Sequence, residues 1–419
     1  MNENRQKCIS DFTLAYYSSD RKTGSLQIVS RKNNETKITE LERLPETDLK
    51  KALKPILIGV TENHQVITLN PETKKIKLSS QFPCDAFAAH NYSDPTSQND
   101  WLMNDGDKET GNDTLNCAQG GSSVTVIEGR NSSNAKYLET ICVGRGHHQA
   151  NFSHPSDAMP HVPRQAYISN LTDGTVSVIG NDPKQQNSFL KVIATIDLCE
   201  PEKEDQAKQT IPNNAFPHGL VYSKVSGKAY NLNNGYGTIA VIDPVTHEIK
   251  ERIPFKGHSN LFITPDGRYI IGRGADRKND AQHVVAKLTV FDVKTHTILD
   301  SLTLKDVYIS KYYFNPEGTR LFLTTSSSGN DEQQANLKTD ALLIFDLDKL
   351  PNLSMLDELR LGSSSGSLTF VKNAEGTSTV FSSNSKDGKL IVIDADKPEI
   401  IETIDVCQPI SHSRTWAIS

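Results

Sequence analysis

Residues 217–292 read PHGLVYSKVSGKAYNLNNGYGTIAVIDPVTHEIKERIPFKGHSNLFITPDGRYIIGRGADRKNDAQHVVAKLTVFD. This stretch holds one complete copy of a pattern and most of a second copy. Each copy has an entry His, a strand, a turn, a second strand, a loop and a strand that ends in Asp. His218 opens the first copy and His258 the second, and TIAVIDPVT corresponds to LTVFDVKT. A repeat of this length built from short strands predicts the blade of a β-propeller.

The third strand of each blade is the clearest mark of the repeat, because it is rich in Val and Ile and is apolar or alternates apolar with polar residues. These marks end at Ser30, Asn70, Glu128, Gly180, Asp243, Asp292, Asp346 and Asp394. They predict an all-β fold, a single closed eight-bladed β-propeller. Seven blades remain the alternative, because no convincing inner strand precedes Ile56 at the second mark.

The two ends of the chain look like parts of one blade. The last residues, HSRTWAIS, resemble an inner strand with no strand after it, whereas TLAYYSS and SLQIVS resemble a second and a third strand with no inner strand before them. We therefore expect residues 412–419 to pair beside residues 13–18. The alternative is an open array of hairpins, which would leave unpaired sheet edges.

Composition restricts the class of protein. A closed propeller is one unit, so residues 1–419 are expected to form a single domain despite the length. The formal net charge of −6 argues against a nucleic-acid partner. No run of 18 apolar residues exists, and no signal peptide is visible in MNENRQKCIS. The one helix that we expect is a short amphipathic one at 44–54.

Long insertions fall on two kinds of loop, those joining second to third strands and those entering an inner strand. Since strands alternate in direction, both kinds lie on one face of the ring. The insertions are at 104–121, 200–214, 277–285 and 327–339. This long-loop face is where we expect a small ligand or a protein partner to bind. The sequence does not indicate an oligomeric state.

Histidines gather at one location of the repeat. Five of the 12 His lie within two positions of the entry to an inner strand, and His90 lies a few positions deeper in another. Imidazole is a common ligand for copper and for haem iron. The alternative interpretation is a hydrated channel lined by polar side chains. The candidate ligands to a metal or haem-like group are His147, His148, His218, His258, His412 and His90.

Two further groups of charged residues are candidates for ion binding. Arg145, Arg273 and Arg414 lie close to the same face and suit an anion, such as a carboxylate-bearing tetrapyrrole or a small oxyanion. Solvated charges that balance acidic loops are the alternative. Asp105, Asp107 and Asp113 lie in one acidic loop with the oxygen ligands that Ca²⁺ takes. That loop lacks the EF-hand spacing, so a solvated acidic loop is favoured over a calcium site.

Six Cys are too few for a disulfide scaffold. Antiparallel pairing places the start of a third strand beside the end of a fourth, so Cys117 can approach Cys142. Such a disulfide would join the long loop to its blade and would imply an oxidising compartment. The sequence contains no CxxCH, GxSxG or HExxH motif and no phosphate loop.

The stretch VGRGHHQANFSHPS, followed by RQAYISNLTDGTVSVIG, resembles the YVTN-type propeller repeat. YVTN repeats are similar to the haem d1 propeller of cytochrome cd1 nitrite reductases. The resemblance implies an eight-bladed ring and a periplasmic or extracellular location. It specifies the fold better than the activity, because this chain lacks the cytochrome c domain of the nitrite reductases and the cupredoxin domain of nitrous oxide reductase.

Three functions are then open. The first is a non-catalytic binding or scaffold protein of the YVTN type. The second is a redox enzyme that uses copper or haem d1 held by the channel histidines. The third is a lactonase-like hydrolase with a divalent metal in the channel, although the expected ring of Glu, Asp and Asn is not evident on the inner strands.

Overall fold

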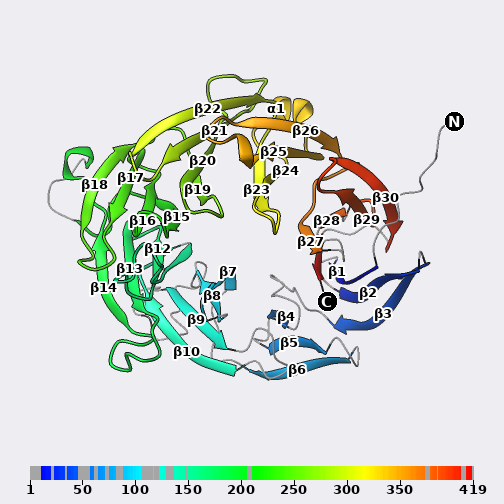
Figure 1. The fold of residues 1–419 in the computed structure, drawn as a ribbon, viewed down its shortest axis with the longest axis horizontal. Helices are drawn as coiled ribbons and strands as arrows, with labels where there is room; N and C mark the ends of the chain where they lie inside the picture. The colour runs from blue at the N-terminus through cyan, green and yellow to red at the C-terminus, as the bar shows by residue number, and fades with distance from the viewer. Residues whose placement is uncertain are drawn as a thin grey trace.

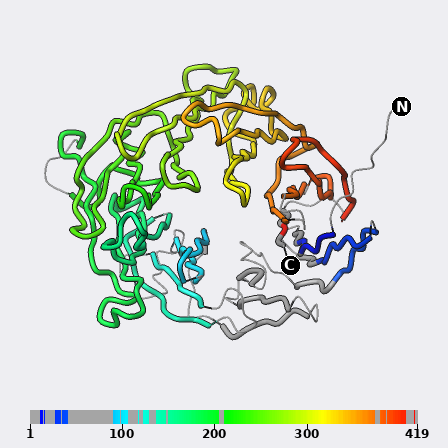
Figure 2. The backbone as a smooth tube through the Cα atoms, viewed as in Figure 1, coloured from blue at the N-terminus to red at the C-terminus, as the bar shows by residue number. Residues whose placement is uncertain are grey.

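The strands of the chain form sheets that stand in sequence order around a central opening. The computed structural model describes residues 11–19, 23–33, 35–45, 57–60, 65–70, 75–81, 88–97, 99–105, 117, 122–128, 136–146, 149–204, 210–372, 378–384, 386–406 and 412–417. These residues form seven four-stranded antiparallel sheets and one three-stranded sheet. Figure 1 shows the ring along its short axis, and Figure 2 traces the same path of the backbone. The fold is a β-propeller.

The strands from the N-terminal half have the following bounds: β1 Phe12–Ser19, β2 Thr23–Lys32, β3 Glu35–Pro45, β4 Leu57–Val60, β5 Gln65–Asn70, β6 Lys75–Gln81, β7 Ala88–Ser93, β8 Asp100–Asn104, β9 Ser122–Glu128, β10 Lys136–Val143, β11 Ala150–Ser153, β12 Gln165–Asn170, β13 Thr175–Gly180 and β14 Val192–Asp197. The remaining strands are β15 Pro217–Ser223, β16 Lys228–Asn233, β17 Thr238–Ile242, β18 Ile249–Pro254, β19 Asn260–Ile263, β20 Tyr269–Asp276, β21 Val285–Asp292, β22 Thr297–Lys305, β23 Ile309–Phe314, β24 Arg320–Thr325, β25 Ala341–Asp346, β26 Ser354–Arg360, β27 Leu368–Lys372, β28 Ser378–Asn384, β29 Lys389–Asp394, β30 Glu399–Asp405 and β31 His412–Ala417. In Figure 1 the first strand of a sheet lies nearest the central opening and the fourth lies outermost.

All eight predicted third-strand marks are strands in the structure, namely β2, β5, β9, β13, β17, β21, β25 and β29. Seven of them occupy the third position from the inside of a four-stranded sheet. The exception, β5, lies in the three-stranded sheet β4-β5-β6, where the sequence shows no convincing inner strand. Burial explains the signal, since every residue of β13 and β17 is buried.

The two ends of the chain meet in one sheet, as predicted. The sheet runs β3-β2-β1-β31, so the C-terminal strand is the inner strand beside the N-terminal ones. The register pairs Leu14 with Ala417 and Ser19 with His412. Thr369 on β27 of the preceding sheet donates its Oγ1–H to the Thr415 carbonyl at 2.8 Å. The pairing of β31 with β1 satisfies backbone N–H and C=O groups that would be unpaired if β1 were an edge strand.

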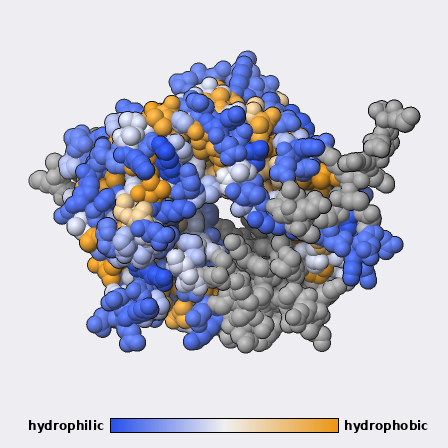
Figure 3. All heavy atoms as spheres, viewed as in Figure 1, coloured by the Kyte–Doolittle hydropathy of each residue, from blue (hydrophilic) through white to orange (hydrophobic). Residues whose placement is uncertain are grey.

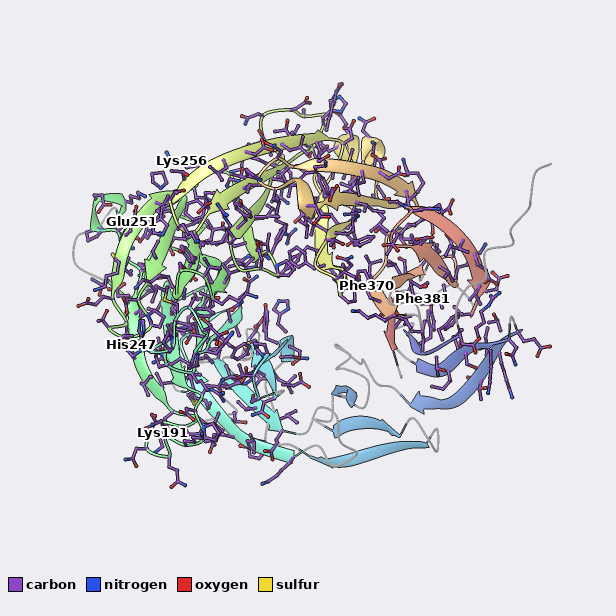
Figure 4. All side chains as sticks on the ribbon, in the orientation of Figure 1. Lys191, His247, Glu251, Lys256, Phe370 and Phe381 are labelled. Atoms are coloured by element: carbon purple, nitrogen blue, oxygen red, sulfur yellow. A yellow bond between two sulfur atoms is a disulfide. The ribbon has the colours of Figure 1, made fainter. Side chains whose placement is uncertain are left out.

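The hydrophobic core lies between consecutive sheets. One cluster joins Leu323 and Phe345 of the sheet β23–β26 to Phe262 and Leu288 of the sheet before it. At the chain ends, the Phe12 and Phe381 ring centroids lie 4.6 Å apart and connect β1 with β28. Figure 4 shows Phe381 beside Phe370 on the neighbouring strand β27. Such clusters connect six pairs of consecutive four-stranded sheets among the described residues.

Helix is scarce in the described residues, as expected, but the predicted location was wrong in part. Leu44 and Pro45, the start of the helix expected at 44–54, belong to strand β3, and the rest of that segment lies outside the described residues. The α-helix in the described part of the chain is α1 (Asp331–Asn336), in the insertion at 327–339. Short 3-10 turns occur at Pro201–Lys203 and Leu347–Lys349. No helix among the described residues is long and apolar enough to cross a membrane.

Candidate functional site

Two long insertions of neighbouring sheets contact each other on the long-loop face. The insertion at 277–285 joins β20 to β21, and the insertion at 327–339 joins β24 to β25. The contact is made by side chains of α1 and of its N-cap residue, which bond to the backbone of the neighbouring insertion. Asn330 Nδ2 donates to the Ala281 carbonyl at 3.2 Å, and Asn336 Nδ2 donates to the Gln282 carbonyl at 3.0 Å.

Gln333 is the centre of this contact. Its side chain is 1 % exposed, and its Nε2 lies 2.7 Å from the Asp280 carbonyl, 3.1 Å from the Arg277 carbonyl and 3.4 Å from the His283 carbonyl. Its Oε1 accepts from Asn330 N at 3.0 Å, which completes a capping box at the start of α1. Because a buried amide is costly unless its hydrogen bonds are made, this arrangement holds both insertions in one geometry.

A pocket of about 770 Å³ opens beside these two insertions. Its volume falls in the range typical of small-molecule sites, roughly 300–1,000 Å³. The pocket is lined by residues of β20, β21, β22, both insertions and the connection into β19: Gly257, Ala275, Asp276, Arg277, Lys278, Asn279, Val285, Lys287, Thr303, Gly329, Asn330 and Gln333. No lining residue comes from an inner strand, so the pocket lies away from the innermost strands around the central opening.

Two glycines of β20 make room for this pocket and for the side chains beneath it. A Cβ at Gly274 would lie 1.8 Å from the Gly257 carbonyl oxygen, and a Cβ at Gly272 would lie 2.3 Å from the Phe255 ring. Gly274 pairs with Lys287, which pairs in turn with Thr303, so these three residues form one row across the sheet. Because its partner on β20 is Gly274, no side chain of that strand covers Lys287.

The charges of the pocket are predominantly positive. Arg277 bonds to Ser328 Oγ at 3.2 Å, and its guanidinium lies 5.7 Å from the centroid of the Tyr308 ring. Lys287 is half-buried, and its ammonium makes no hydrogen bond or ion pair with any residue that the structure describes. Asp276 is the acidic lining residue, and hydrogen bonds from the Lys278 and Asn279 backbone N–H groups help to lower the pKa of its carboxyl.

The innermost strands are joined by a belt of amide side chains. Gln149, just before β11, accepts from Leu220 N at 3.1 Å and donates to Asn260 Oδ1 at 3.3 Å. Asn151 donates to the Leu220 carbonyl at 3.3 Å. One side chain thus bonds to the inner strands of the next two sheets. These hydrogen bonds join the inner strands of three consecutive sheets. Figure 3 shows the opening as a hollow at the centre of a mostly hydrophilic face.

Two of the predicted histidine ligands, His218 and His258, have different environments. His218 on β15 is half-buried, and its Nδ1 lies 2.7 Å from the Ser259 carbonyl. A carbonyl only accepts, so Nδ1 of His218 is protonated and donates to Ser259.

His258 does not meet the expectation that it borders the channel with His218. It is 7 % exposed and stacks on Phe255, with ring centroids 4.0 Å apart. Its Nε2 lies 2.8 Å from Thr289 Oγ1 and its Nδ1 lies 3.4 Å from the Phe255 carbonyl. Burial, together with the nearby Lys287 charge, lowers the pKa of His258 to about 4. The Phe255 ring lies directly above Gly272, with the His258 ring next to it, so His258 is a packing residue.

The other candidate histidines are only partly defined. His90 lies on β7, half-buried, with its ring centroid 6.2 Å from that of Tyr92. His412 begins β31, but its side chain lies outside the described residues, as do His147 and His148 entirely. Among the residues described, no three His, Cys, Asp or Glu side chains are grouped to hold a metal ion. The copper or haem site at these histidines stays a prediction.

The candidate anion-binding arginines that the structure describes are engaged in the protein. Arg145 Nε lies 2.7 Å from Asp173 Oδ1, and Arg145 N lies 2.8 Å from Asp173 Oδ2. Arg273 on β20 donates to the Ile309 carbonyl of the next sheet, and burial lowers its pKa. Arg414 lies on β31, with its side chain outside the described residues. The described arginines thus join segments of the ring.

The acidic loop and the cysteines gave different outcomes. Asp105 is buried at the end of β8, and its carbonyl accepts from Ser122 Oγ at 3.1 Å. Asp107 and Asp113 lie outside the described residues, so the calcium loop stays a prediction.

Cys117 and Cys142 form a disulfide, the bridge expected from the strand order. It joins the insertion at 104–121 to the outer strand β10.

The insertion at 200–214 is tied to the sheet β15–β18. Glu200 is 3 % exposed, and its carboxylate accepts from Thr238 Oγ1 and pairs with Lys203. Glu204 accepts from Asn214 N at 2.7 Å and from the Tyr236 hydroxyl. These bonds involve both described ends of the insertion, while 205–209 lie outside the described residues.

The residues that shape the pocket are not among those predicted from the sequence. Gln333 lies in a polar stretch with no strand or site motif, although Asn330 and Gln333 have the spacing of a capping box. Lys287 also carries a signal, since it is a lysine in the mostly apolar third strand VAKLTVFD. Both signals were weak, because neither residue type has a fixed partner in the local sequence.

Comparisons with known proteins agree with this architecture. No family model and no curated protein matches the sequence. Dihydro-heme d1 dehydrogenase NirN, solved in complex with DHE, matches with a TM-score of 0.55 and 11 % identity over 99 % of this chain and 77 % of that chain. The chain has the fold of this propeller class, as the YVTN-like repeat predicts.

Two further solved structures match along nearly their whole length. Apo AztD from Citrobacter koseri has a TM-score of 0.54 and 12 % identity, covering 98 % of this chain and 99 % of that chain. A putative 6-phosphogluconolactonase from Bacteroides uniformis has a TM-score of 0.51 and 12 % identity, covering 96 % and 99 %. Identities this low show a common fold, and the neighbours differ in their named activities.

Proposed function

We propose that the protein is a YVTN-type binding protein that holds a small ligand on the long-loop face. The observation that carries this proposal is the set of hydrogen bonds from Gln333 to the insertion at 277–285. A surface loop that served only as a connection would not need a buried amide with three backbone acceptors. A geometry fixed before binding lowers the cost of ordering the site around its ligand.

The innermost strands favour binding over catalysis. Gln149 and Asn151 direct their amides to Leu220 and Asn260 of the next two sheets. Thr369 bonds to Thr415 in the same way at the chain ends. Groups engaged in holding the ring together are poorly placed to take part in a reaction, which leaves the insertions as the surface for recognition.

The proposal includes one closed eight-bladed domain over residues 1–419. The sheet β4-β5-β6 would be the second blade, since β5 coincides with the second of the eight repeat marks. The proposal also includes a periplasmic or extracellular location, supported by the Cys117–Cys142 disulfide. Disulfides form and persist in oxidising compartments.

Native mass spectrometry of protein purified from its own cells tests the binding function. We expect a retained small molecule in the wild type that is lost from Gln333→Ala. It should be kept by Glu248→Gln, which alters an exposed residue of a turn between third and fourth strands on the opposite face. Equal retention by both variants would contradict a site on the long-loop face.

A redox enzyme with copper or haem d1 is the second candidate. One observation favours it: ligating histidines commonly donate their second ring N–H to a carbonyl, as His218 does to Ser259. An absorption spectrum and metal analysis of the purified protein separate the two candidates. A visible haem band, or copper in a stoichiometric amount, would favour the enzyme over the binding protein.

A further inference from the structure

We propose that the pocket between β20–β22 and α1 binds a small organic oxyanion, a carboxylate or a phosphate ester, with Lys287 as its central contact. This inference rests on the proposed function and names the class of ligand. It also moves the site away from the central channel, where the histidine pattern had pointed, to the space between two neighbouring sheets.

Lys287 is the first support. Lys287 is a half-buried residue that lines a pocket of about 770 Å³, and its ammonium makes no ion pair or hydrogen bond within the described part of the chain. A charge that is partly removed from water is stabilised by a counter-charge. Lys338, in the insertion of the next sheet, has one in Glu358 at 2.7 Å. A ligand oxyanion would supply the counter-charge that the described residues do not.

The surroundings of Lys287 are the second support. Arg277 and Lys278 add two positive charges to the lining, whereas the whole chain carries a net charge of −6. The one acidic lining residue, Asp276, accepts hydrogen bonds from Lys278 N at 2.9 Å and from Asn279 N at 3.1 Å. Asp276 thus stabilises the turn of its own loop. The lining residues carry more positive than negative charges.

The shape of the pocket is the third support. Gly257 and Gly274 place backbone against backbone at one side of the Lys287 row, so no side chain fills the space. Thr303 continues the row with a hydroxyl, and Val285 and Ala275 supply apolar surface. A ligand with an anionic group beside Lys287 and Arg277 and a small, partly apolar remainder matches this combination of groups.

Arg277 is held ready for such a ligand. Its Nη1 bonds to Ser328 Oγ at 3.2 Å, and its guanidinium lies over the Tyr308 ring. Two contacts of this kind orient the guanidinium while leaving other N–H donors in the plane of the fork. A guanidinium oriented in this way suits bidentate recognition of a carboxylate or phosphate.

Isothermal titration of the full-length protein at low salt tests this inference with three probes: citrate, glucose 6-phosphate and neutral glucose. We expect citrate or glucose 6-phosphate to bind, with affinity that falls as salt is added, and glucose not to bind. Which anion binds more tightly decides between a carboxylate and a phosphate ester. No binding of either anion at 10 mM would overturn the proposal.

Variants locate the binding. Lys287→Gln and Arg277→Gln should each weaken binding at least tenfold, and Lys287→Arg should retain most of it. Lys294→Gln is the matched control, because it removes one exposed lysine at the other end of the same sheet. Circular dichroism and the melting temperature confirm that each variant is folded. Binding that is indifferent to both Lys287→Gln and Arg277→Gln would place the anion elsewhere and refute the site.

Failure here is distinguishable from failure of the proposed function. A natural ligand that is lost from Gln333→Ala but kept by Lys287→Gln leaves the binding protein in place and rejects the oxyanion. A natural ligand kept by all these variants rejects both. The identity of the retained molecule gives an independent answer, since an uncharged compound contradicts the chemistry proposed for Lys287.

Discussion

His247 and His296 occupy the same turn position in consecutive sheets, and each ring bonds to the second strand of the preceding sheet. His247 Nε2 lies 2.9 Å from Gln165 Nε2 on β12, and His296 Nε2 lies 3.3 Å from the Tyr230 hydroxyl on β16. Both residues have positive φ, 58° and 53°. Figure 4 shows His247 and Glu251 toward the outside of the ring. These histidines fasten neighbouring sheets on the face opposite the long loops.

The first prediction concerns His296→Asn. Asn tolerates positive φ, so the variant removes the ring and its bonds to Tyr230 and Glu251 without straining the turn. Tyr230 keeps its bonds to Ser226 and to the Val293 carbonyl. We expect a loss of about 1–2 kcal/mol in the free energy of unfolding, measured with urea.

A double-mutant cycle with Glu251→Gln separates the His296–Glu251 hydrogen bond from the phenol contact. Because the Glu251 side chain is 50 % exposed, the coupling should be under about 1 kcal/mol. A larger coupling, or no loss for His296→Asn alone, would contradict this account of the fastening.

The second prediction is a pH dependence that originates at His258. Its folded pKa of about 4 lies below the ordinary value of 6.5. Between these values the unfolded chain takes up a proton that the folded protein does not. Stability is therefore complete above pH 6.5 and decreases as the pH falls toward 4, by roughly 3 kcal/mol for this residue.

Urea unfolding of the wild type and of His258→Gln at pH 7.5, 6.5, 5.5 and 4.5 measures this contribution. The variant should be less stable at pH 7.5 but should lose less stability on acidification. His161→Gln, which removes an exposed imidazole, should follow the wild-type slope. Parallel slopes for the wild type and His258→Gln would show that the buried ring is not the source.

The third prediction concerns the pairing of β31 with β1. Deletion of residues 411–419 removes the inner strand beside Leu14–Ser19 and opens the ring, so cooperative unfolding should be lost. Thr415→Val is the milder test. It removes the hydroxyl that lies 2.8 Å from Thr369 Oγ1 and should cost about 1 kcal/mol. An unchanged melting transition in the deletion variant would refute closure through this strand.

The fourth prediction concerns the disulfide. Cys117 and Cys142 are 25 residues apart, and a crosslink over a loop of this length stabilises a protein by about 3 kcal/mol in the chain-entropy model. The double variant Cys117→Ser, Cys142→Ser should lose stability of that order. Cys199→Ser, which alters a free cysteine, should not. Peptide mapping without reductant should recover the two linked peptides, and free thiols at both positions would contradict an oxidising location.

The fifth prediction concerns the mobility of the insertion at 277–285. Gln333→Ala removes the buried amide, whereas Gln334→Ala on the same helix removes an amide that bonds to the Gly329 carbonyl at 3.0 Å. Hydrogen–deuterium exchange should rise in residues 277–283 in the first variant and stay unchanged there in the second. Similar protection in both would show that other contacts order the loop.

The repeat architecture was predictable from the sequence because its signals are local. The third strands ending in Asp243 and Asp292 are apolar and short, and the turns between strands contain Gly. The unmatched strand types at Thr13 and His412 indicated which ends pair. The approach of Cys117 to Cys142 followed from antiparallel strand order alone. Each of these inferences needs only the period of a strand and the alternation of strand direction.

The roles of side chains between sheets were decided by tertiary structure. His218 and His258 have similar positions in the repeat, yet one bonds to a neighbouring inner strand and the other is buried on Phe255. Gly272 leaves space in the adjacent second strand, and the stacked rings of Phe255 and His258 lie against it. Gln333 likewise has its acceptors in another sheet. The sequence by itself determined the strands, their order and the face of the long loops, since these depend on local periodicity. Whether a side chain packs in the core, bonds to a neighbouring sheet or lines the pocket depends on contacts between sheets, which no local pattern encodes.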